Sequence, residues 1–339
     1  MTSPNTPCRI AINGFGRIGR LALRAAPADV EVVAVNDLAD PESLAYLFRN
    51  DSVHGRLHEP VGLKDGRLEW QGRSIPFFNR RDPRELPWGA LGVDVVIEAT
   101  GALRGRADGG RHLEAGAKHV LLTAPGDDVD RTIVMGVNEH ELDLANDRFV
   151  SNASCTTNCI APVAKVLHAA FGIESLVFTT IHAYTSSQTL VDTPMRKLRR
   201  GRAGALSMVP TSTGASKALG QVLPALAGRS AGMAVRVPVP DGSLTDMVVR
   251  FSRPPADVTG LLEPLRRAAA TPALARILEV SDEELVSHDV VGDEHSAVVD
   301  ATTVMRCSAD TFKLLVWYDN EWGYANRVID LARRLCGRE

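Results

Sequence analysis

The sequence has little net charge and little cysteine. Its 38 Lys and Arg residues nearly balance its 41 Asp and Glu residues, which leaves a net charge of −3. So small an imbalance gives no indication of general attraction to nucleic acids or membranes. The five cysteines are odd in number and irregularly spaced, which fits a reducing cytoplasm better than a disulfide scaffold.

Long apolar runs are also missing. The first residues, MTSPNTPCRIAING, contain no apolar core as long as that of a signal peptide. No other run approaches the ~20 apolar residues that span a bilayer. We therefore expect a cytoplasmic protein without a membrane segment, and 339 residues are enough for about two domains.

The first half alternates short β-branched runs with helical stretches. RIAIN (9–13), VEVVAVND (30–37) and VDVVIEATG (93–101) are predicted strands, and IGRLALRAA (18–26) is a predicted helix. Continuous apolar strands interleaved with helices are typical of a parallel sheet that is covered on both faces. This half is predicted to be a doubly wound α/β domain.

The second half has longer strand candidates that lie further apart. The predicted helices are 156–172 and 256–270, and the predicted strands are 176–184, 233–240, 243–252 and 312–319. This spacing favours an α+β domain with a mostly antiparallel sheet and helices on one side. An arginine-rich loop over 185–208 has the length of a functional or interface segment.

A glycine-rich turn follows the first predicted strand. Gly14, Gly16 and Gly19 form the pattern G-x-G-x-x-G between that strand and the next helix. Gly14 allows the tight turn, Gly16 lets the backbone approach a pyrophosphate, and Gly19 permits close packing of helix on strand. A plain tight turn gives the same glycines, so the interpretation as a dinucleotide site depends on the flanking strand and helix.

Asp37 ends the second predicted strand, about 20 residues after the glycines, where an acid would bind the adenosine ribose. A carboxylate there accepts hydrogen bonds from the 2′-hydroxyl and repels a 2′-phosphate. NAD is therefore predicted over NADP. An ordinary turn residue at the end of a strand is the alternative.

The segment SNASCTTNC (151–159) holds two cysteines in different surroundings. Capping residues flank Cys155, which is therefore predicted at a helix N-terminus, where amides and the helix dipole favour a thiolate. Cys159 lies one turn further, among apolar residues, where a thiol is inert. The spacing does not suit a disulfide, and no further ligands indicate zinc, so no metal is expected. A buried structural cysteine stays the alternative for Cys155.

His182, in TTIHAYT at the end of a predicted strand, is the best partner for Cys155. A nucleophilic cysteine needs a base to accept its proton or an imidazolium to stabilise its thiolate. A core histidine with satisfied hydrogen bonds is the alternative.

Several segments together resemble phosphorylating glyceraldehyde-3-phosphate dehydrogenase. They follow the order of that family from about Arg9 to Leu335: INGFGRIGR, SNASCTTNC, HAYT, STGASKA, RVPVP and WYDNEWGYANRV. The resemblance implies a Rossmann domain over 1–153 with a returning helix over 321–339, and a catalytic domain over 154–320. It also implies a homotetramer in which the arginine-rich loop lies between subunits.

The resemblance also implies the roles of individual residues. Cys155 is the nucleophile and His182 its base. NAD is bound by Gly14, Gly16, Arg17, Ile18, Gly19, Asp37, Arg81, Thr123 and Asn320, the last orienting the nicotinamide amide. Glyceraldehyde 3-phosphate and inorganic phosphate are bound at two anion sites, formed by Thr185 and Arg236 and by Ser154, Thr156, Thr213 and Gly214, with Arg200 as a further anion contact.

Three alternatives stay open at this point. Erythrose-4-phosphate dehydrogenase shares the cysteine motif, and the segments DTP (192–194) and LPW (86–88) resemble those of an NADP-preferring gluconeogenic relative. A non-enzymatic RNA-binding protein using RKLRRGR (196–202) is remote. Because this run lacks interleaved aromatics, a solvated or subunit-facing loop is the better interpretation and no nucleic acid is expected.

Overall fold

The computed structural model describes residues 7–338 and divides into two compact units. The first unit comprises Met1–Ile133, His140–Ala153 and Ala325–Glu339, and the second comprises Val134–Glu139 and Ser154–Tyr324. The domain boundaries expected from the sequence stay a prediction, and residues 1–6 and 339, which they include, lie outside the described residues. Within residues 7–338, no helix has the length and apolar character needed to span a bilayer.

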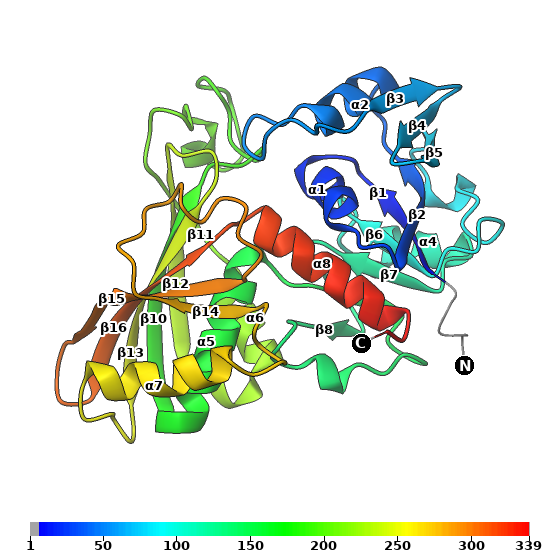
Figure 1. Cartoon of the computed structure of the whole chain (residues 1–339). Helices are drawn as coiled ribbons and strands as arrows, with labels where there is room; N and C mark the ends of the chain where they lie inside the picture. The colour runs from blue at the N-terminus through cyan, green and yellow to red at the C-terminus, as the bar shows by residue number, and fades with distance from the viewer. Residues whose placement is uncertain (1–6, 339) are drawn as a thin grey trace. The chain divides into compact units, whose positions relative to one another are not determined.

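The first unit is built on a nine-stranded sheet in the order β3-β4-β5-β2-β1-β6-β7-β9-β8 (Figure 1). All neighbours from β5 to β8 pair in parallel, whereas β3, β4 and β5 pair antiparallel. The strands are β1 (Cys8–Asn13), β2 (Val30–Asn36), β3 (Val61–Lys64), β4 (Arg67–Trp70), β5 (Arg73–Phe78), β6 (Val95–Glu98), β7 (His119–Leu122), β8 (Arg131–Thr132) and β9 (Phe149–Ser151).

The first unit also contains helices. They are α1 (Arg17–Ala25), α2 (Pro41–Arg49), α3 (Arg106–Gly109), α4 (Arg111–Glu114) and, from Ala325 onward, α8 (Trp322–Leu335). Strands β1, β2 and β6 are buried along almost their whole length, as expected of a parallel sheet covered on both faces. The predicted doubly wound Rossmann fold is confirmed. The strands over 61–78 were not predicted.

The second unit contains a seven-stranded sheet in the order β11-β12-β10-β13-β16-β15-β14. The pairs β10–β12 and β14–β15 are parallel and the other neighbours antiparallel. The strands are β10 (Ile173–Ala183), β11 (Val209–Ser212), β12 (Ser230–Val237), β13 (Ser243–Phe251), β14 (Leu278–Ser281), β15 (Ala297–Arg306) and β16 (Thr311–Tyr318). The mostly antiparallel character predicted for this sheet is confirmed.

Three helices, α5 (Cys155–Phe171), α6 (Ala215–Val222) and α7 (Val258–Ala269), pack against this sheet, and α5 also packs against both α6 and α7 (Figure 1). Helix α5 begins where predicted because Ser154 caps it: the Ser154 hydroxyl accepts the Thr157 N–H at 3.1 Å. The α+β architecture of this unit is confirmed. Short 3₁₀ turns lie at Pro83–Glu85, Glu139–Glu141, Leu198–Gly201 and Pro224–Leu226.

One cysteine pair differs from the expectation of a reducing environment. Cys8, at the start of β1, forms a disulfide with Cys336, directly after α8, across a sequence separation of 328. Both residues belong to the first unit. The spacing of the cysteines gives no sign of this pair, because only the fold brings the two ends of the chain together. Cys155, Cys159 and Cys307 are free thiols.

Candidate active site

The glycine turn of the first unit has the geometry that its sequence predicts. Gly14 has φ +94°, and a Cβ there would lie 2.6 Å from the Thr100 nitrogen. A Cβ on Gly19 would lie 2.1 Å from the Gly14 oxygen, so α1 approaches the turn closely. Around Gly16 there is open space, and Gly16 provides no side-chain cap to α1. The first amides of α1 can therefore face a bound pyrophosphate.

A cavity of about 350 Å³ lies at this turn. Of the residues predicted to bind the cofactor, Gly14, Gly16, Asp37 and Arg81 line it. The other predicted residues of this unit, Arg17, Ile18, Gly19 and Thr123, are not among the described residues that line it. Arg17 forms an ion pair with Asp51 at 2.6 Å, and the Thr123 hydroxyl donates to the Glu98 carbonyl at 3.2 Å.

Asp37 is held in position by two backbone amides. Its Oδ2 accepts the Phe15 N–H at 2.7 Å and its Oδ1 accepts the Ala39 N–H at 2.9 Å. A carboxylate has about four lone-pair sites, so both oxygens retain capacity for ribose hydroxyls. The glycine cradle, the cavity and this fixed carboxylate together fit NAD.

Behind the cavity, a buried polar network fixes the ends of β1, β2 and β6. The Asn13 amide donates to Glu98 at 2.5 Å, and the Asn36 amide donates to the Asn13 oxygen at 2.7 Å. His112 Nε2 lies 3.2 Å from the same Glu98 carboxylate, and its Nδ1 accepts the Trp88 indole N–H at 2.9 Å. Because Asn13 and Asn36 also line the cavity, this network holds its floor rigid.

In the second unit, helix α5 and strand β10 bring Cys155 and His182 together. The Cys155 sulfur, at the first residue of α5, lies 3.4 Å from His182 Nε2, near the end of β10. Cys155 is partly exposed, whereas His182 is 4% exposed. Cys159 is fully buried, and burial raises its pKa, which fits an inert thiol. The arrangement is a thiol in contact with an imidazole at a helix N-terminus.

The protonation of this pair differs from the thiolate and imidazolium considered in the sequence analysis. Burial raises the pKa of the Cys155 thiol, against the lowering effects of the Arg236 charge and of hydrogen bonds from Thr156. Burial, followed by the charge of Arg236, lowers the pKa of His182 to about 3. In this structure, desolvation outweighs the helix amides, and both groups are neutral at pH 7.

Arg236 fixes the tautomer of His182. The two residues are register partners in the parallel strands β10 and β12, and Arg236 Nη1 lies 2.7 Å from His182 Nδ1. A guanidinium can only donate, so Nδ1 accepts and the proton of the neutral ring lies on Nε2, facing the sulfur. The Ala183 carbonyl oxygen lies 2.8 Å from both Arg236 Nη1 and His182 Nδ1. It accepts from Arg236 in this tautomer, and it is the acceptor for Nδ1–H in the other tautomer.

Tyr318 is a residue of this site that the sequence analysis missed. Its ring packs edge-on against His182, with centroids 6.0 Å apart, and its hydroxyl lies 2.7 Å from Thr180 Oγ1 and 3.1 Å from Thr156 Oγ1. Tyr318 thus supports the imidazole from β16. Its position at the start of WYDNEWGY was the available signal. The same contact places the Thr156 side chain in the interior, 4% exposed.

The predicted anion contacts fall into two groups. In the first group, the Thr185 hydroxyl lies 2.8 Å from Ser187 Oγ. Arg200 lies beside this pair: its Nη1 is 3.5 Å from Ser187 Oγ, and its Nε donates to Thr211 Oγ1 at 3.1 Å. Arg200 and Arg236 also act together, since the charges of both lower the pKa of His182.

The second group lies at helix starts. Thr213 Oγ1 accepts the Ala215 N–H at 3.2 Å, and Gly214 precedes α6 without a side-chain cap. Ser154 caps α5 as described above. Because Gly214 has no side chain to cap the helix, the amides that follow Ala215 at the start of α6 can face an anion.

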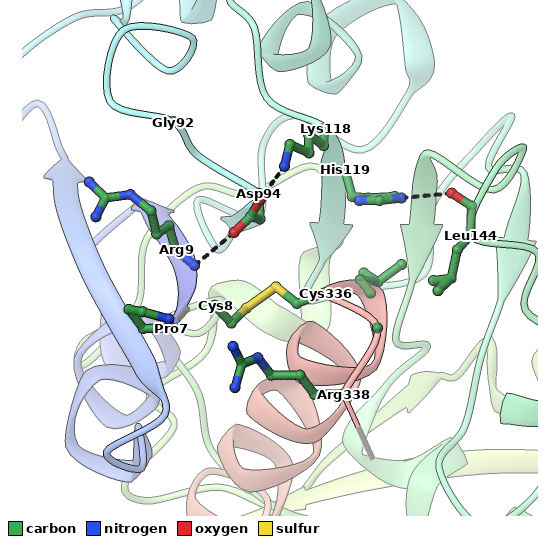
Figure 2. Close-up of a pocket in the computed structure, with 12 residues that line it drawn as sticks. Pro7, Cys8, Arg9, Gly92, Asp94, Lys118, His119, Leu144, Cys336 and Arg338 are labelled. Atoms are coloured by element: carbon green, nitrogen blue, oxygen red, sulfur yellow. Dashed lines mark hydrogen bonds and ion pairs between the residues drawn. A yellow bond between two sulfur atoms is a disulfide. The ribbon is translucent and has the colours of Figure 1, made fainter. Parts of the chain in front are cut away.

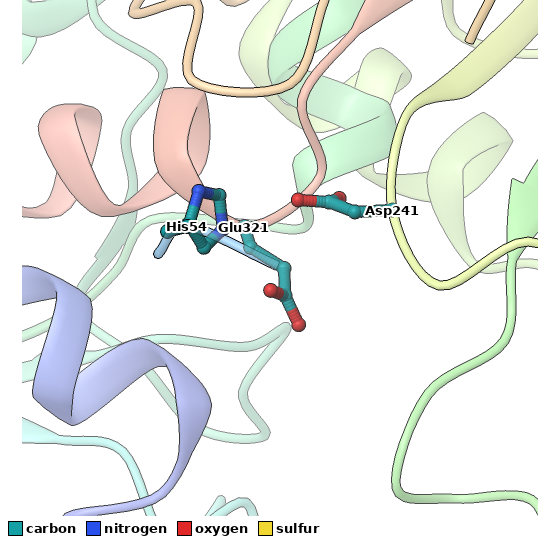
Figure 3. A group of neighbouring side chains, drawn as sticks. All are labelled: His54, Asp241 and Glu321. Carbon is teal, nitrogen blue, oxygen red and sulfur yellow. The ribbon is translucent and has the colours of Figure 1, made fainter. Parts of the chain in front are cut away.

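Asn320 and two acidic residues complete the described surroundings of the pair within this unit. The Asn320 amide oxygen accepts the Ser243 hydroxyl, which fixes the orientation of the amide. Carboxylate oxygens of Asp241 and Glu321 lie within 4.8 Å of each other (Figure 3). Their charges oppose those of the arginines: Asp241 raises the pKa of Cys155 and Glu321 raises that of His182.

A Rossmann unit with a dinucleotide cradle defines the class of nicotinamide-dependent oxidoreductases, and the second unit adds a thiol in contact with an imidazole. The family model "glyceraldehyde 3-phosphate dehydrogenase, NAD binding domain" matches residues 8–106, and "glyceraldehyde 3-phosphate dehydrogenase, C-terminal domain" matches residues 154–320. The chain belongs to the glyceraldehyde-3-phosphate dehydrogenase family, whose cofactor is NAD.

Similarity to proteins of this name extends over nearly the whole chain. The chain is 47% identical over 333 residues to glyceraldehyde-3-phosphate dehydrogenase of Borreliella burgdorferi, covering 96% of this chain and 99% of that protein. It is 48% identical over 334 residues to glyceraldehyde-3-phosphate dehydrogenase 2 of Bacillus subtilis, covering 97% of each. It is 50% identical over 339 residues to glyceraldehyde-3-phosphate dehydrogenase 2 of Streptomyces arenae, covering 96% and 97%.

Proposed function

We propose that this protein oxidises D-glyceraldehyde 3-phosphate with NAD and inorganic phosphate, giving 1,3-bisphosphoglycerate in glycolysis or gluconeogenesis. The observation that carries the proposal is the contact of 3.4 Å between the Cys155 sulfur and His182 Nε2, with Arg236 on the far side of the imidazole. A thiol is the required nucleophile because a thioester conserves the free energy of oxidation that a free acid would lose.

In the first stage, the Cys155 sulfur attacks the aldehyde carbon and forms a thiohemiacetal. His182 takes up the proton, and the first amides of α5 donate to the developing oxyanion. NAD, when bound by the glycine turn, Asp37 and Arg81, supplies the acceptor for the hydride. Oxidation leaves a thioester on Cys155.

Arg236 controls when His182 can act as a base. While Arg236 donates to Nδ1, the ring proton lies on Nε2, which can then donate to the sulfur but cannot accept its proton. A substrate phosphate is a stronger acceptor for Arg236 than an imidazole nitrogen. Once phosphate takes Arg236 away, Nδ1–H can donate to the Ala183 carbonyl, 2.8 Å away, and Nε2 becomes the basic nitrogen. Binding of the substrate phosphate to Arg236 thus converts His182 into a base.

In the second stage, an oxygen of inorganic phosphate attacks the thioester carbon and the C–S bond breaks. The product 1,3-bisphosphoglycerate leaves, and the Cys155 sulfur takes back the proton held by His182. The accessible amides at the start of α6, together with Thr213 and the hydroxyl of Ser154, are suited to hold this dianion. Thr185 and Arg200 are assigned to the phosphate group of the substrate together with Arg236. Thr156 contributes through its hydrogen bonds to the Cys155 sulfur, since its side chain is buried against Tyr318.

The proposal is tested by a phosphate-dependence assay. Reduction of NAD by glyceraldehyde 3-phosphate is expected to require phosphate or arsenate, whereas a non-phosphorylating aldehyde dehydrogenase needs neither. Equal or faster turnover of erythrose 4-phosphate would instead identify an erythrose-4-phosphate dehydrogenase. Salt-sensitive RNA binding without any dehydrogenase activity would favour the alternative of a non-enzymatic RNA-binding protein.

Replacing Asp37 with alanine is expected to weaken NAD binding and admit NADP. Loss of hydrogen bonds from the ribose to a carboxylate should raise KM for NAD by about 10-fold or more. Arg80 and Arg81 line the same cavity, so a 2′-phosphate would meet two cations once the carboxylate is removed. Steady-state kinetics with both cofactors measure the change. If Asp37→Ala leaves the NAD/NADP ratio unchanged, Asp37 is only a turn residue. Combining it with Arg81→Ala should remove the gain with NADP.

The reaction rate is expected to rise with pH. Because burial raises the pKa of Cys155, the thiolate fraction is small at pH 7 and grows as the pH increases. His182, with a pKa of about 3, stays neutral and should contribute no acid limb between about pH 6 and pH 9. Alkylation of Cys155 by iodoacetamide measures this, and His182→Asn should shift the profile to higher pH. Fast alkylation that is already constant at pH 6 would contradict the assignment.

We place the protein in the cytoplasm as a homotetramer. Large apolar side chains of the arginine-rich loop are exposed, with Leu190 at 80%, Leu198 at 83% and Leu206 at 84%. Val177, Met233 and Met305 are likewise exposed on three strands of the second unit. Surfaces of this kind are typical of subunit contacts. Sedimentation equilibrium measures the mass of the assembly.

A further inference from the structure

The disulfide between Cys8 and Cys336 lies at a site of its own. It joins the first residue of β1 to the residue that follows α8, with Cα atoms 5.8 Å apart (Figure 2). None of the residues assigned above to catalysis or to NAD takes part in it. The oxidised pair therefore has no role in the proposed reaction, which needs only the thiol of Cys155.

A cavity of about 590 Å³ gives access to this bond, and both cysteines line it (Figure 2). The two residues differ in exposure, because Cys8 is 1% exposed whereas Cys336 is partly exposed. Of the two residues, Cys336 is therefore the more accessible from the cavity, and attack on its sulfur would make the Cys8 sulfur the leaving group. Thiol–disulfide exchange depends on which sulfur can be attacked.

The cavity carries more positive than negative charge. It is lined by the cations Arg9, Lys118 and Arg338 and by one carboxylate, that of Asp94. Asp94 is paired with Lys118 at 2.7 Å. Arg9 is held by Glu31 at 2.6 Å. The acid that pairs with Arg338 is Asp29, at 3.9 Å, and this acid is already bound by Arg333 at 2.9 Å. Arg338 is therefore the cation best placed to attract an anionic thiol.

The surrounding structure accommodates the reduced pair as well. The Cys8 sulfur lies 3.8 Å from the Ala332 carbonyl oxygen, which can accept a hydrogen bond from the released thiol. Helix α8 keeps the ion pair from Arg333 to Asp29, and its residues Leu331, Ala332 and Leu335 are buried. Opening the bond therefore leaves this helix docked in its unit.

We propose that Cys8–Cys336 is a reversible thiol-exchange site for an anionic small-molecule thiol of the glutathione type. The thiolate attacks the Cys336 sulfur and the disulfide bond breaks. Its electron pair leaves on Cys8, which takes up a proton. A second thiol then attacks the mixed disulfide on Cys336, so that two thiols are oxidised to their disulfide while the protein gains two thiols. The exchange loosens the constraint on the chain ends and leaves Cys155 unchanged.

Peptide mapping tests the route of attack. Protein purified without reductant is incubated with glutathione, quenched with acid, alkylated and digested with trypsin, which gives peptides 1–9 and 335–338. We expect the linked pair of peptides to disappear, a transient glutathione adduct on Cys336, and alkylation of Cys8. Absence of the linked pair at the start, its persistence with glutathione, or an adduct on Cys8 would overturn the proposal.

Arg338→Ala tests the charge of the cavity. Removing this cation should slow reduction by glutathione several-fold and reduction by 2-mercaptoethanol by clearly less, because the glutathione thiolate carries one negative charge more than the 2-mercaptoethanol thiolate. An equal effect on both thiols would show that Arg338 does not attract the anionic thiol.

Thermal unfolding tests the effect on the chain. A bond that closes almost the whole chain restricts the unfolded state, so reduction should lower Tm by about 5 °C. The double variant Cys8→Ser with Cys336→Ser should match the reduced wild type, keep its dehydrogenase activity and show no response to glutathione. Equal Tm values for oxidised and reduced protein would show that the bond restrains nothing.

Discussion

Replacing Cys155 with serine is expected to lower dehydrogenase turnover by about 10⁴-fold or more while NAD binding is retained. The serine hydroxyl has a far higher pKa than a thiol, and His182, whose pKa burial and the Arg236 charge lower to about 3, is too weak a base to activate it. The variant also cannot form a thioester, so the attack by inorganic phosphate is lost together with the oxidation step. Steady-state turnover and calorimetric titration with NAD measure the two halves of this prediction.

The chain offers a matched control for this variant. Cys159→Ser changes the same atom one helical turn further along α5, but the Cys159 sulfur lies in the core near Thr245 and Val316. It should cost some stability and leave the chemistry of the remaining enzyme intact. Undiminished turnover in Cys155→Ser, or an equal loss in Cys159→Ser, would remove the case for Cys155 as the nucleophile.

The parts of the fold that sequence predicted best are those in which burial determines the residue pattern. Strands β1, β2 and β6 are continuous apolar runs because both of their faces are covered. The hairpin strand β3 alternates between half-buried and exposed residues over only four positions, which leaves too weak a signal. Strand β15 was missed because it follows a long irregular segment and its second half is largely exposed.

For the site, the sequence indicated the residues but not their protonation states. The capping residues around Cys155 predict its place at the start of α5, and the structure brings His182 to it. Whether helix amides or desolvation dominates depends on the packing of both groups, which no local pattern records. The contact between Arg236 and His182 likewise follows from the register of β10 and β12, and the link from Cys8 to Cys336 from the docking of α8.

Replacing Arg236 with leucine is expected to change the turnover of two substrates in opposite directions. With glyceraldehyde 3-phosphate, kcat/KM should fall by about 10- to 100-fold, because charge-assisted hydrogen bonds to the phosphate are lost. With glyceraldehyde, which has no phosphate, kcat should rise several-fold. In the wild type this substrate leaves Arg236 on His182 Nδ1, 2.7 Å away, whereas in the variant Nδ1–H is able to donate to Ala183 and Nε2 is basic.

Arg200→Leu is the matched control for this experiment. Arg200 acts on the same region through Thr211 and Ser187, but the described contacts give it no hydrogen bond to His182. It should lose affinity for the phosphorylated substrate, seen as a higher KM, without any gain in kcat for glyceraldehyde. If Arg236→Leu lowers the turnover of both substrates, Arg236 only maintains the shape of the site. A gain confined to Arg236→Leu would show that the guanidinium restrains the base until phosphate removes it.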